Sequence, residues 1–447
     1  MDVSGRRVTV LGLGRHGGGV AAARWLARQG AVVTVTDLAD EAALADSLAE
    51  LADEPIFRYR LGGHDARDVH EAELVVVNPA VKPGNPLVKT ALDAGAAITS
   101  ETELFLARCP AHVVGVTGSN GKSTTAAMAA EILAADGRRV WLGGNIGRSL
   151  LDDLPRIGPR DWVVLELSSF QLWWLADGAR WPETGVVTNC APNHLDWHGS
   201  LAHYISAKQR LLARQPPGGL AVINPLDPVV GRWAPPARGR SVGPAADEHI
   251  PPLAVPGMHN RSNAACAAAL AGALGCSLAA IERGLSRFKG LPHRLQFVGE
   301  VAGRRFYDDS MATTPESVMA AVDTLAPRGW FLVGGKDKGC DFNPLIEKLA
   351  TAARGVGCFG AARDTLAAML ARRAPRRVYA SFETMAEALA WCWEHSRADD
   401  SIALSPGCAS HDQFRDYRHR GATFVTLVRA LAARRDQVRQ APARDEP

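Results

Sequence analysis

The segment 113–125, VVGVTGSNGKSTT, constrains this chain more than any other because it has the form of a phosphate-binding loop. An apolar run enters a glycine-containing turn, and Lys122 and Ser123 then begin an alanine-rich stretch that predicts a helix. Backbone N–H groups in such a turn surround phosphate oxygens, the lysine reaches the terminal phosphates and the serine hydroxyl binds Mg²⁺. The spacing differs from the common GxxxxGK[ST] loop, since Val116 stands five residues before Gly121. The segment predicts an ATP site formed by Gly118, Ser119, Asn120, Gly121, Lys122, Ser123 and Thr124.

Composition and charge narrow the class of protein. A chain of 447 residues with 47% hydrophobic and 22% charged residues is an ordinary globular protein of about two to four domains. The net charge of +3 and the lack of a basic stripe argue against a nucleic-acid partner, and the short apolar runs argue against a membrane span. The N-terminus lacks signal-peptide features, and the eight cysteines form no C-x-x-C pair. We expect a cytoplasmic monomer with reduced thiols and no membrane partner.

The N-terminal segment has the order of a dinucleotide-type fold. A predicted strand at 8–11 runs into GLGRHG at 12–17, a predicted helix follows at 20–29, and a second strand ends at Asp37. Taken alone, this fingerprint also fits an NAD-dependent oxidoreductase, although that alternative leaves the phosphate loop at 113–125 unexplained.

The rest of the chain alternates predicted strands and helices, which indicates an α/β fold with mostly parallel sheets. The first domain is predicted to end near residue 105, and a third unit to begin near residue 291. Further strands are predicted at 74–78, 113–116, 140–142, 162–166, 185–189, 221–224, 306–308, 330–333 and 402–404, and a closing helix of the second unit at 258–274.

Polar residues follow several of these strands, where ligands bind in open α/β sheets. Glu166 ends the strand WVVLE and is a candidate second ligand for nucleotide-bound Mg²⁺, with a solvated strand end as the plain alternative. His194 follows the next strand, and Lys208 lies in a predicted helix, where a lysine is usually a solvated cation. In the third unit, GGKDKG at 334–339 and SPGCAS at 405–410 suit capture of an anion.

Nine ordered motifs together resemble the Mur ligase family. They are TGSNGKSTT, LELSSFQL, NHLDWHG, YISAKQRL, GMHNRSNA, LPHRLQ, DDSMATT, GGKDKG and SPGCASHDQF. The resemblance implies a UDP-binding Rossmann-like domain at 1–105, a central P-loop-type ATPase at 106–291 and a Rossmann-like domain that brings the amino acid at 292–447. It also implies an ATP-dependent ligase of peptidoglycan precursor synthesis. LELSSFQL and SPGCASHDQF point to addition of D-glutamate to UDP-N-acetylmuramoyl-L-alanine through an acyl phosphate, with the same ligation of L-glutamate as the alternative.

The same resemblance assigns roles to individual residues. Catalysis would depend on Lys122, Glu166, His194 and Lys208. Two Mg²⁺ ions would be held by Ser123, Glu166, His194 and Lys208, the last as a carbamate. Further ATP contacts would come from Asn260, Arg294 and Asp309. The UDP substrate would contact Gly14, Arg15, His16, Asp37, Asn78 and Asn145. Glutamate would contact Thr313, Lys338, Ser410 and Tyr417.

Some positions depart from the family pattern. Met311 stands where many relatives have a lysine, Asn193 stands where an aspartate precedes the histidine, and Arg15 and His16 replace smaller residues. A pattern similar to DDSMATT is associated with use of L-glutamate in relatives, so both stereoisomers stay open. Folylpolyglutamate synthase lacks this N-terminal domain, and a regulatory protein on an inactive ligase scaffold would not require all four catalytic residues.

Overall fold

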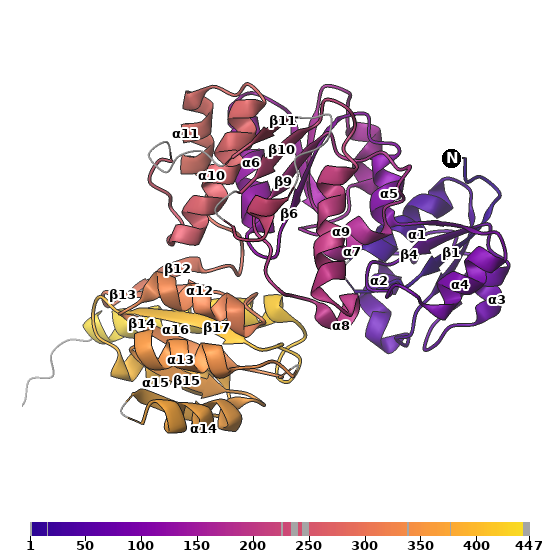
Figure 1. Cartoon of the computed structure of the whole chain (residues 1–447). Helices are drawn as coiled ribbons and strands as arrows, with labels where there is room; N and C mark the ends of the chain where they lie inside the picture. Colours follow the sequence, from indigo (N-terminus) through magenta and orange to yellow (C-terminus); the bar gives the residue numbers. More distant parts are fainter. Residues whose placement is uncertain are drawn as a thin grey trace, which may run out of the picture. The chain divides into compact units, whose positions relative to one another are not determined.

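The computed structural model describes residues 2–15, 17–224, 227–233, 240–243, 250–337, 339–375 and 377–440. The chain divides into two compact units, which are Met1–Leu253 with Asn260–Phe288, and Ala254–His259 with Lys289–Pro447. Both units are α/β structures whose sheets are mostly parallel, as predicted (Figure 1). The predicted domain boundaries at 105 and 291 remain predictions.

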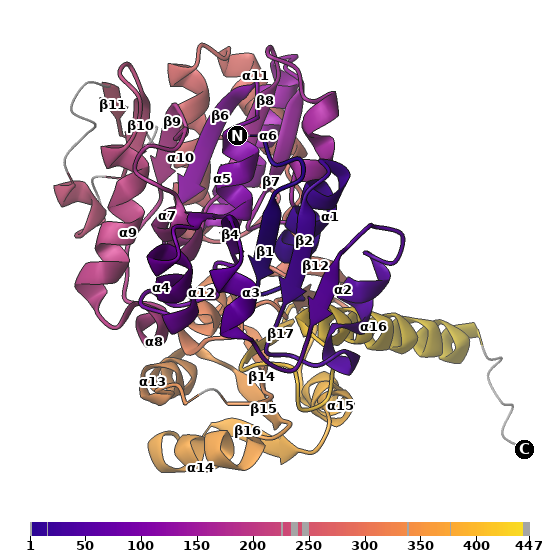
Figure 2. The ribbon, with the colours of Figure 1, turned by 90° about the vertical axis from the view of Figure 1, so that its right-hand side faces the viewer.

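The first sheet of unit 1 is parallel and has the order β3-β2-β1-β4-β5, so that β1 lies between β2 and β4 (Figure 2). Its central strands are the valine-rich segments, since strands covered on both faces need apolar residues throughout. The elements are β1 (Arg7–Leu11), α1 (Gly18–Arg28), β2 (Val32–Thr36), the 3₁₀ helix η1 (Ala42–Leu44), α2 (Ala45–Ala49), β3 (Arg58–Arg60), α3 (Ala66–His70), β4 (Leu74–Val77), α4 (Pro86–Asp93), β5 (Ala97–Thr99) and α5 (Glu101–Leu106).

The second sheet of unit 1 is also parallel, in the order β11-β10-β9-β6-β8-β7. Because β6 lies between β9 and β8, the segments that follow these three strands meet at one edge of the sheet. The elements are β6 (His112–Thr117), α6 (Lys122–Ala135), β7 (Val140–Gly144), the 3₁₀ helix η2 (Leu151–Arg156), β8 (Trp162–Glu166), α7 (Ser169–Trp174), β9 (Thr184–Val187), α8 (Leu195–His198), α9 (Leu201–Ala213), β10 (Leu220–Ile223), the 3₁₀ helix η3 (Val230–Arg232), β11 (Arg240–Val242), α10 (Met258–Ala273) and α11 (Leu278–Arg287).

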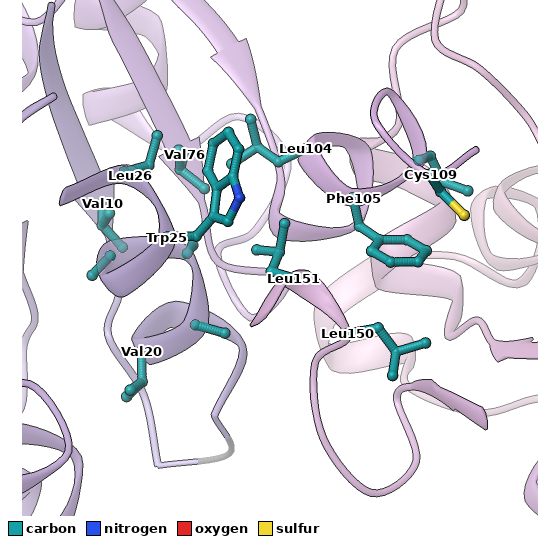
Figure 3. Close-up of a cluster of buried hydrophobic side chains, with 14 of the residues drawn as sticks. Val10, Val20, Trp25, Leu26, Val76, Leu104, Phe105, Cys109, Leu150 and Leu151 are labelled. Atoms are coloured by element: carbon teal, nitrogen blue, oxygen red, sulfur yellow. The ribbon is translucent and has the colours of Figure 1, made fainter. Parts of the chain in front are cut away.

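One hydrophobic core joins the two sheets of unit 1. Trp25 of α1 faces Leu104 of α5, with Leu151 of η2 beside them (Figure 3). At the same junction, the Arg24 guanidinium of α1 lies 2.8 Å from the Asp152 carboxylate of η2. Since these buried side chains come from both sheets, the two sheets share a single core.

Unit 2 contains a six-stranded sheet in the order β12-β13-β17-β14-β15-β16, in which only the β12–β13 pair is antiparallel. Helices pack against the sheet through two separate clusters of buried apolar side chains. The elements are β12 (Gln296–Val301), β13 (Arg304–Asp308), α12 (Pro315–Leu325), β14 (Gly329–Gly334), α13 (Asn343–Ala352), β15 (Gly355–Phe359), α14 (Arg363–Arg373), β16 (Val378–Phe382), α15 (Met385–His395), β17 (Ser401–Gly407) and α16 (Tyr417–Gln440).

The structure differs from the sequence-based expectations in detail. The strand predicted at 185–189 is Thr184–Val187, and the helix expected to close the second unit is followed by α11. The backbone of α11 reaches α6 so closely that a Cβ added at Gly284 would lie 2.4 Å from the Cα of Ile132. Within the described residues, no helix is both long and apolar enough to span a membrane.

Candidate active site

The phosphate loop between β6 and α6 depends on its two glycines. Gly118 has a φ of 155° and Gly121 a φ of 78°, values that favour glycine. A Cβ at Gly118 would lie 2.0 Å from the Thr188 hydroxyl, and one at Gly121 would lie 2.1 Å from the amide oxygen of Asn263. Asn263 was not among the residues predicted from the sequence. Its spacing of three residues from Asn260, on one face of α10, is the signal that identifies it.

The loop is tied to the segment that follows β9. The Ser119 hydroxyl donates to the carbonyl of Ala191 at 2.8 Å and lies 2.7 Å from the Tyr204 hydroxyl. The Asn120 N–H donates to the Asn189 side chain, whose amide returns a bond to the Asn120 carbonyl, both at 2.9 Å. The Ser119 hydroxyl therefore stabilises the conformation of the loop. Ser119, which was predicted to contact ATP, has a buried side chain.

Helix α6 begins at Lys122, directly after the loop. The Lys122 amine donates to the Ser119 carbonyl at 2.9 Å, and Ser123 and Thr124 are buried in the first turn. The first N–H groups of a helix precede its first internal hydrogen bond and face outward along the helix axis. Together with the lysine they form an anion-binding end of the helix.

Glu166 ends β8, beside Val116 of β6, and is 2% exposed. One carboxylate oxygen accepts a hydrogen bond from the Asn145 side chain at 2.7 Å. The other oxygen, Oε2, is buried and has no hydrogen-bond partner among the described residues. Buried polar atoms are nearly always satisfied, so an orphaned carboxylate oxygen beside a phosphate loop fits a cation ligand.

Lys208 lies on α9 and is only 1% exposed. Its amine donates to the Gly118 carbonyl at 2.7 Å and lies 4.7 Å above the centre of the Tyr204 ring. Burial, reinforced by the nearby charge of Lys122, holds the pKa of Lys208 well below its ordinary value. The side chain is therefore a buried lysine that readily becomes a neutral amine, the form that reacts as a nucleophile.

His194 precedes α8 with a φ of 54°, a left-handed conformation that is uncommon for a residue with a side chain. Its N–H donates to the Asn193 side chain at 2.8 Å, and the Phe170 ring packs against its imidazole. No group of three or more His, Cys, Asp or Glu side chains within the described ranges is arranged to hold a metal. The predicted ligand set differs from such a group because it includes Ser123 and a modified lysine.

Most of the residues predicted to meet the UDP moiety lie at one turn of the first sheet, whereas Asn145 follows β7 of the second sheet. Asp37 accepts hydrogen bonds from the N–H groups of Gly14 and Ala39 at 2.9 and 2.8 Å. The Asn78 amide donates to the Gly12 carbonyl at 3.1 Å. Asp37 and Asn78 therefore shape the glycine turn. Among the other candidates, Arg15 is exposed and His16 lies outside the described residues.

Unit 2 contains the remaining candidates except Asn260, which is buried on α10 in unit 1. Asp309 is buried, and its carboxylate accepts from the Leu295 N–H at 3.0 Å and the Ser405 hydroxyl at 2.6 Å. Ser410 is buried and the Tyr417 ring packs edge-on against His293, whereas Lys338 lies outside the described residues. Arg294 and Thr313 are partly buried in the same unit.

Arg420 of α16 was not selected from the sequence, yet it connects two of the predicted glutamate-binding loops. It is fully buried and donates to the hydroxyl and carbonyl of Ser310 and to the carbonyl of Cys408 at 2.9–3.2 Å. Burial lowers its pKa to about 10. An arginine in a helix gives no local signal for such a position, because its burial depends on the tertiary fold.

Burial raises the pKa of Asp309 to about 7, which predicts a pH dependence of stability. The folded state binds a proton that the unfolded state releases above its pKa of 3.8, so stability falls as the pH rises from about 4 to 7. We expect Asp309→Asn to raise the free energy of unfolding by about 2 kcal/mol at about pH 8 and to flatten this slope. Urea unfolding at several pH values checks this, with the exposed Asp323→Asn as control. Parallel pH profiles for wild type and Asp309→Asn would contradict it.

Comparisons with known proteins agree with this architecture. Three family models match: "Mur ligase MurD-like, N-terminal domain" at residues 6–100, "Mur ligase middle domain" at 116–242, and "Mur ligase, glutamate ligase domain" at 293–408. The chain is 36% identical to the UDP-N-acetylmuramoylalanine--D-glutamate ligase of Trichlorobacter lovleyi, over 96% of this chain and 100% of that protein. It is 35% identical to the ligase of the same name from Geobacillus kaustophilus, over 95% of this chain and 98% of that protein.

The structure of UDP-N-acetylmuramate-alanine ligase MurC from Thermotoga maritima has the same fold. Its TM-score is 0.62 at 21% identity, and the match covers 95% of this chain and 99% of that chain. The chain therefore belongs to the Mur ligase family and is a ligase. This membership favours the ligase interpretation over an oxidoreductase, and the glycine turn at 12–17 is part of the matched N-terminal domain.

Proposed function

We propose that this chain joins D-glutamate to UDP-N-acetylmuramoyl-L-alanine, with ATP converted to ADP and phosphate, in the synthesis of peptidoglycan precursors. The observation that carries the proposal is the similarity, over nearly the whole chain, to relatives named for this reaction. We further propose that the protein acts in the cytoplasm as a monomer.

The chemistry requires activation of a poor electrophile. An oxygen of the alanyl carboxylate attacks the γ-phosphorus of ATP, the bond to the bridging oxygen breaks, and ADP leaves. The glutamate amine then attacks the carbonyl carbon of the acyl phosphate and loses a proton. The C–O bond to phosphate breaks, which leaves an amide. Positive groups lower both barriers because negative charge gathers at the phosphate during each step.

Lys122 and the first turn of α6 would bind the β- and γ-phosphates. Ser123, Glu166, His194 and carbamylated Lys208 would hold two Mg²⁺ ions, and the buried, unpartnered Oε2 of Glu166 supports this assignment. Bound Mg²⁺ would supply charge neutralisation at the transferring phosphoryl group. Asn145 would keep Glu166 in place through its 2.7 Å hydrogen bond.

The burial of Lys208 supports the proposed carbamylation. A neutral amine combines with CO₂ to form a carbamate and release a proton, which converts the side chain into an anionic oxygen ligand. If the carbamate is required, the activity of wild-type protein falls in CO₂-free buffer and returns when bicarbonate is added.

The remaining assignments are proposals that follow the family motifs. Asn260, Arg294 and Asp309 would contact the nucleotide. Thr313, Lys338, Ser410 and Tyr417 would contact glutamate. Gly14, Arg15, His16, Asp37, Asn78 and Asn145 would contact the UDP substrate.

Phosphate release tests the reaction and its stereochemistry. Purified protein is incubated with ATP, Mg²⁺ and UDP-N-acetylmuramoyl-L-alanine, with either D- or L-glutamate. We expect release with D-glutamate only, which would make Met311 a tolerated substitution. Release with L-glutamate only would favour the alternative substrate and point to the DDSMATT segment as part of the selector. No release with either amino acid would overturn the proposed substrate pair.

A further inference from the structure

A chain of hydrogen bonds connects the three helices α7, α8 and α9 of unit 1. His198 is 6% exposed, its Nε2 lies 2.9 Å from the Ser169 hydroxyl, and its Nδ1 lies 2.7 Å from Nδ1 of His203. Ser169 begins α7, His198 ends α8 and His203 lies in the first turn of α9. The helices pack together, with α7 and α9 side by side (Figure 1).

Each of these elements contains or follows one proposed metal ligand. Glu166 precedes α7, His194 is the residue before α8, and Lys208 is on α9. The Ser169–His198–His203 chain therefore connects the backbone segments of three of the four proposed ligands.

The conformation of His194 needs such support. A left-handed φ at a residue with a side chain is strained and persists only where its surroundings hold it. The His194 carbonyl accepts the backbone N–H of His198 at 3.0 Å, so the orientation of α8, which the His198 side chain anchors to α7 and α9, acts directly on the strained residue. The Phe170 ring packs against the imidazoles of both His194 and His198 and so provides a side-chain contact between them.

The two histidines form a matched pair. Two Nδ1 atoms 2.7 Å apart require one ring to donate and the other to accept, so the doubly protonated pair is excluded. One proton therefore lies between the two facing nitrogens of the pair. The aromatic rings of Trp173 and Tyr204 enclose it.

We propose that His198 and His203 are positioning residues that hold His194 in its strained conformation and so set the affinity of the site for divalent metal. This inference rests on the proposed function, because it takes His194 to be a metal ligand. The alternative is that the pair only fills the core between α7, α8 and α9, in which case its loss would lower stability without altering metal affinity in the folded protein.

Variants separate the individual hydrogen bonds. His203→Asn keeps a polar atom at the Nδ1 position, whereas His203→Ala removes it. His198→Gln keeps a polar atom near Nε2 and loses the bond to His203. The control is Ser206→Ala, which removes an exposed hydroxyl that, among the described residues, bonds to the backbone carbonyl of His203 and not to its imidazole.

The measurement is Mn²⁺ binding to the full chain in the presence of ADP, followed by electron paramagnetic resonance. We expect His203→Ala and His198→Gln to weaken Mn²⁺ binding by about 10- to 100-fold, the usual effect of removing a residue that orients a metal ligand. His203→Asn should restore most of the affinity, and Ser206→Ala should match wild type. The Mg²⁺ concentration that gives half-maximal ligation should rise in parallel, with the KM for the UDP substrate unchanged.

Unchanged Mn²⁺ affinity in folded His203→Ala would overturn the inference, as would failure of His203→Asn to restore it. Circular dichroism shows whether each variant is folded. This test is independent of the proposed substrates. If the wild-type protein binds Mn²⁺ with ADP but ligates neither glutamate isomer, that result rejects the proposed function and leaves the inference about His198 and His203 to be decided by the variants.

Discussion

Replacing Lys208 with methionine is expected to reduce the ligation rate by about 10²–10³-fold, the effect of removing one group that stabilises developing charge. Methionine has a similar volume but cannot form a carbamate, so the proposed anionic ligand is lost. The same change should leave stability equal or slightly higher, because the buried amine, whose pKa is held well below its ordinary value, is replaced by an apolar group. Phosphate release and thermal unfolding measure the two effects.

A large loss of ligation rate without a loss of stability distinguishes a functional lysine from a structural one. A lysine kept for packing and hydrogen bonding to Gly118 would lose stability on substitution and retain its rate per folded molecule. The matched control is Lys89→Met, which replaces an exposed lysine of α4 that forms an ion pair with Asp93. Ligation by Lys208→Met at more than a tenth of the wild-type rate would remove Lys208 from the proposed metal site.

Replacing Arg420 with methionine is expected to lower the free energy of unfolding of unit 2 by about 3–5 kcal/mol, because three buried acceptor atoms lose their donor. These acceptors are the Ser310 hydroxyl, the Ser310 carbonyl and the Cys408 carbonyl. Methionine fills part of the space but donates no hydrogen bond. Urea unfolding monitored by tryptophan fluorescence and circular dichroism provides the measurement.

Arg418→Met is the control, since it makes the same change in the same helix at an exposed position. We expect it to shift stability by less than about 0.5 kcal/mol. Where Arg420→Met remains folded, we also expect a higher KM for glutamate than for wild type, because both loops that Arg420 connects lie beside predicted glutamate-binding residues. Equal stability of the two variants would show that the buried guanidinium contributes nothing net to folding.

The long apolar strands were predictable because their signal is local. Trp162–Glu166 matches its prediction at both ends, and β1, β4 and β6 agree within one or two residues. Short or mixed strands were missed. RYR at 58–60 is a polar edge strand, and GVGCF at 355–359 contains two glycines, so neither has the apolar run that indicates a buried strand.

The residues of the candidate site likewise divide into those that a local sequence signal identifies and those that depend on the tertiary structure. Glycines, Lys122 and Ser123 in one segment predicted a phosphate loop, because that geometry is built from adjacent residues. Arg420 was missed because its position depends on where α16 packs, whereas Asn263 had a local signal in its three-residue spacing from Asn260. Ser119 belongs to the loop by sequence, but its hydroxyl is engaged by Ala191 and Tyr204, contacts across more than seventy residues of chain.

The sequence by itself determined the order of the α/β units, the phosphate loop and, through its ordered motifs, membership of the Mur ligase family. These features reside in short segments whose chemistry is set by neighbouring residues. Only the tertiary structure decided that Glu166 has an unpartnered buried oxygen, that burial lowers the pKa of Lys208, and that His198 and His203 connect the segments of three proposed metal ligands. The physical reason is that burial and hydrogen bonding between distant segments determine charge state and orientation, and neither is encoded in any one stretch of chain.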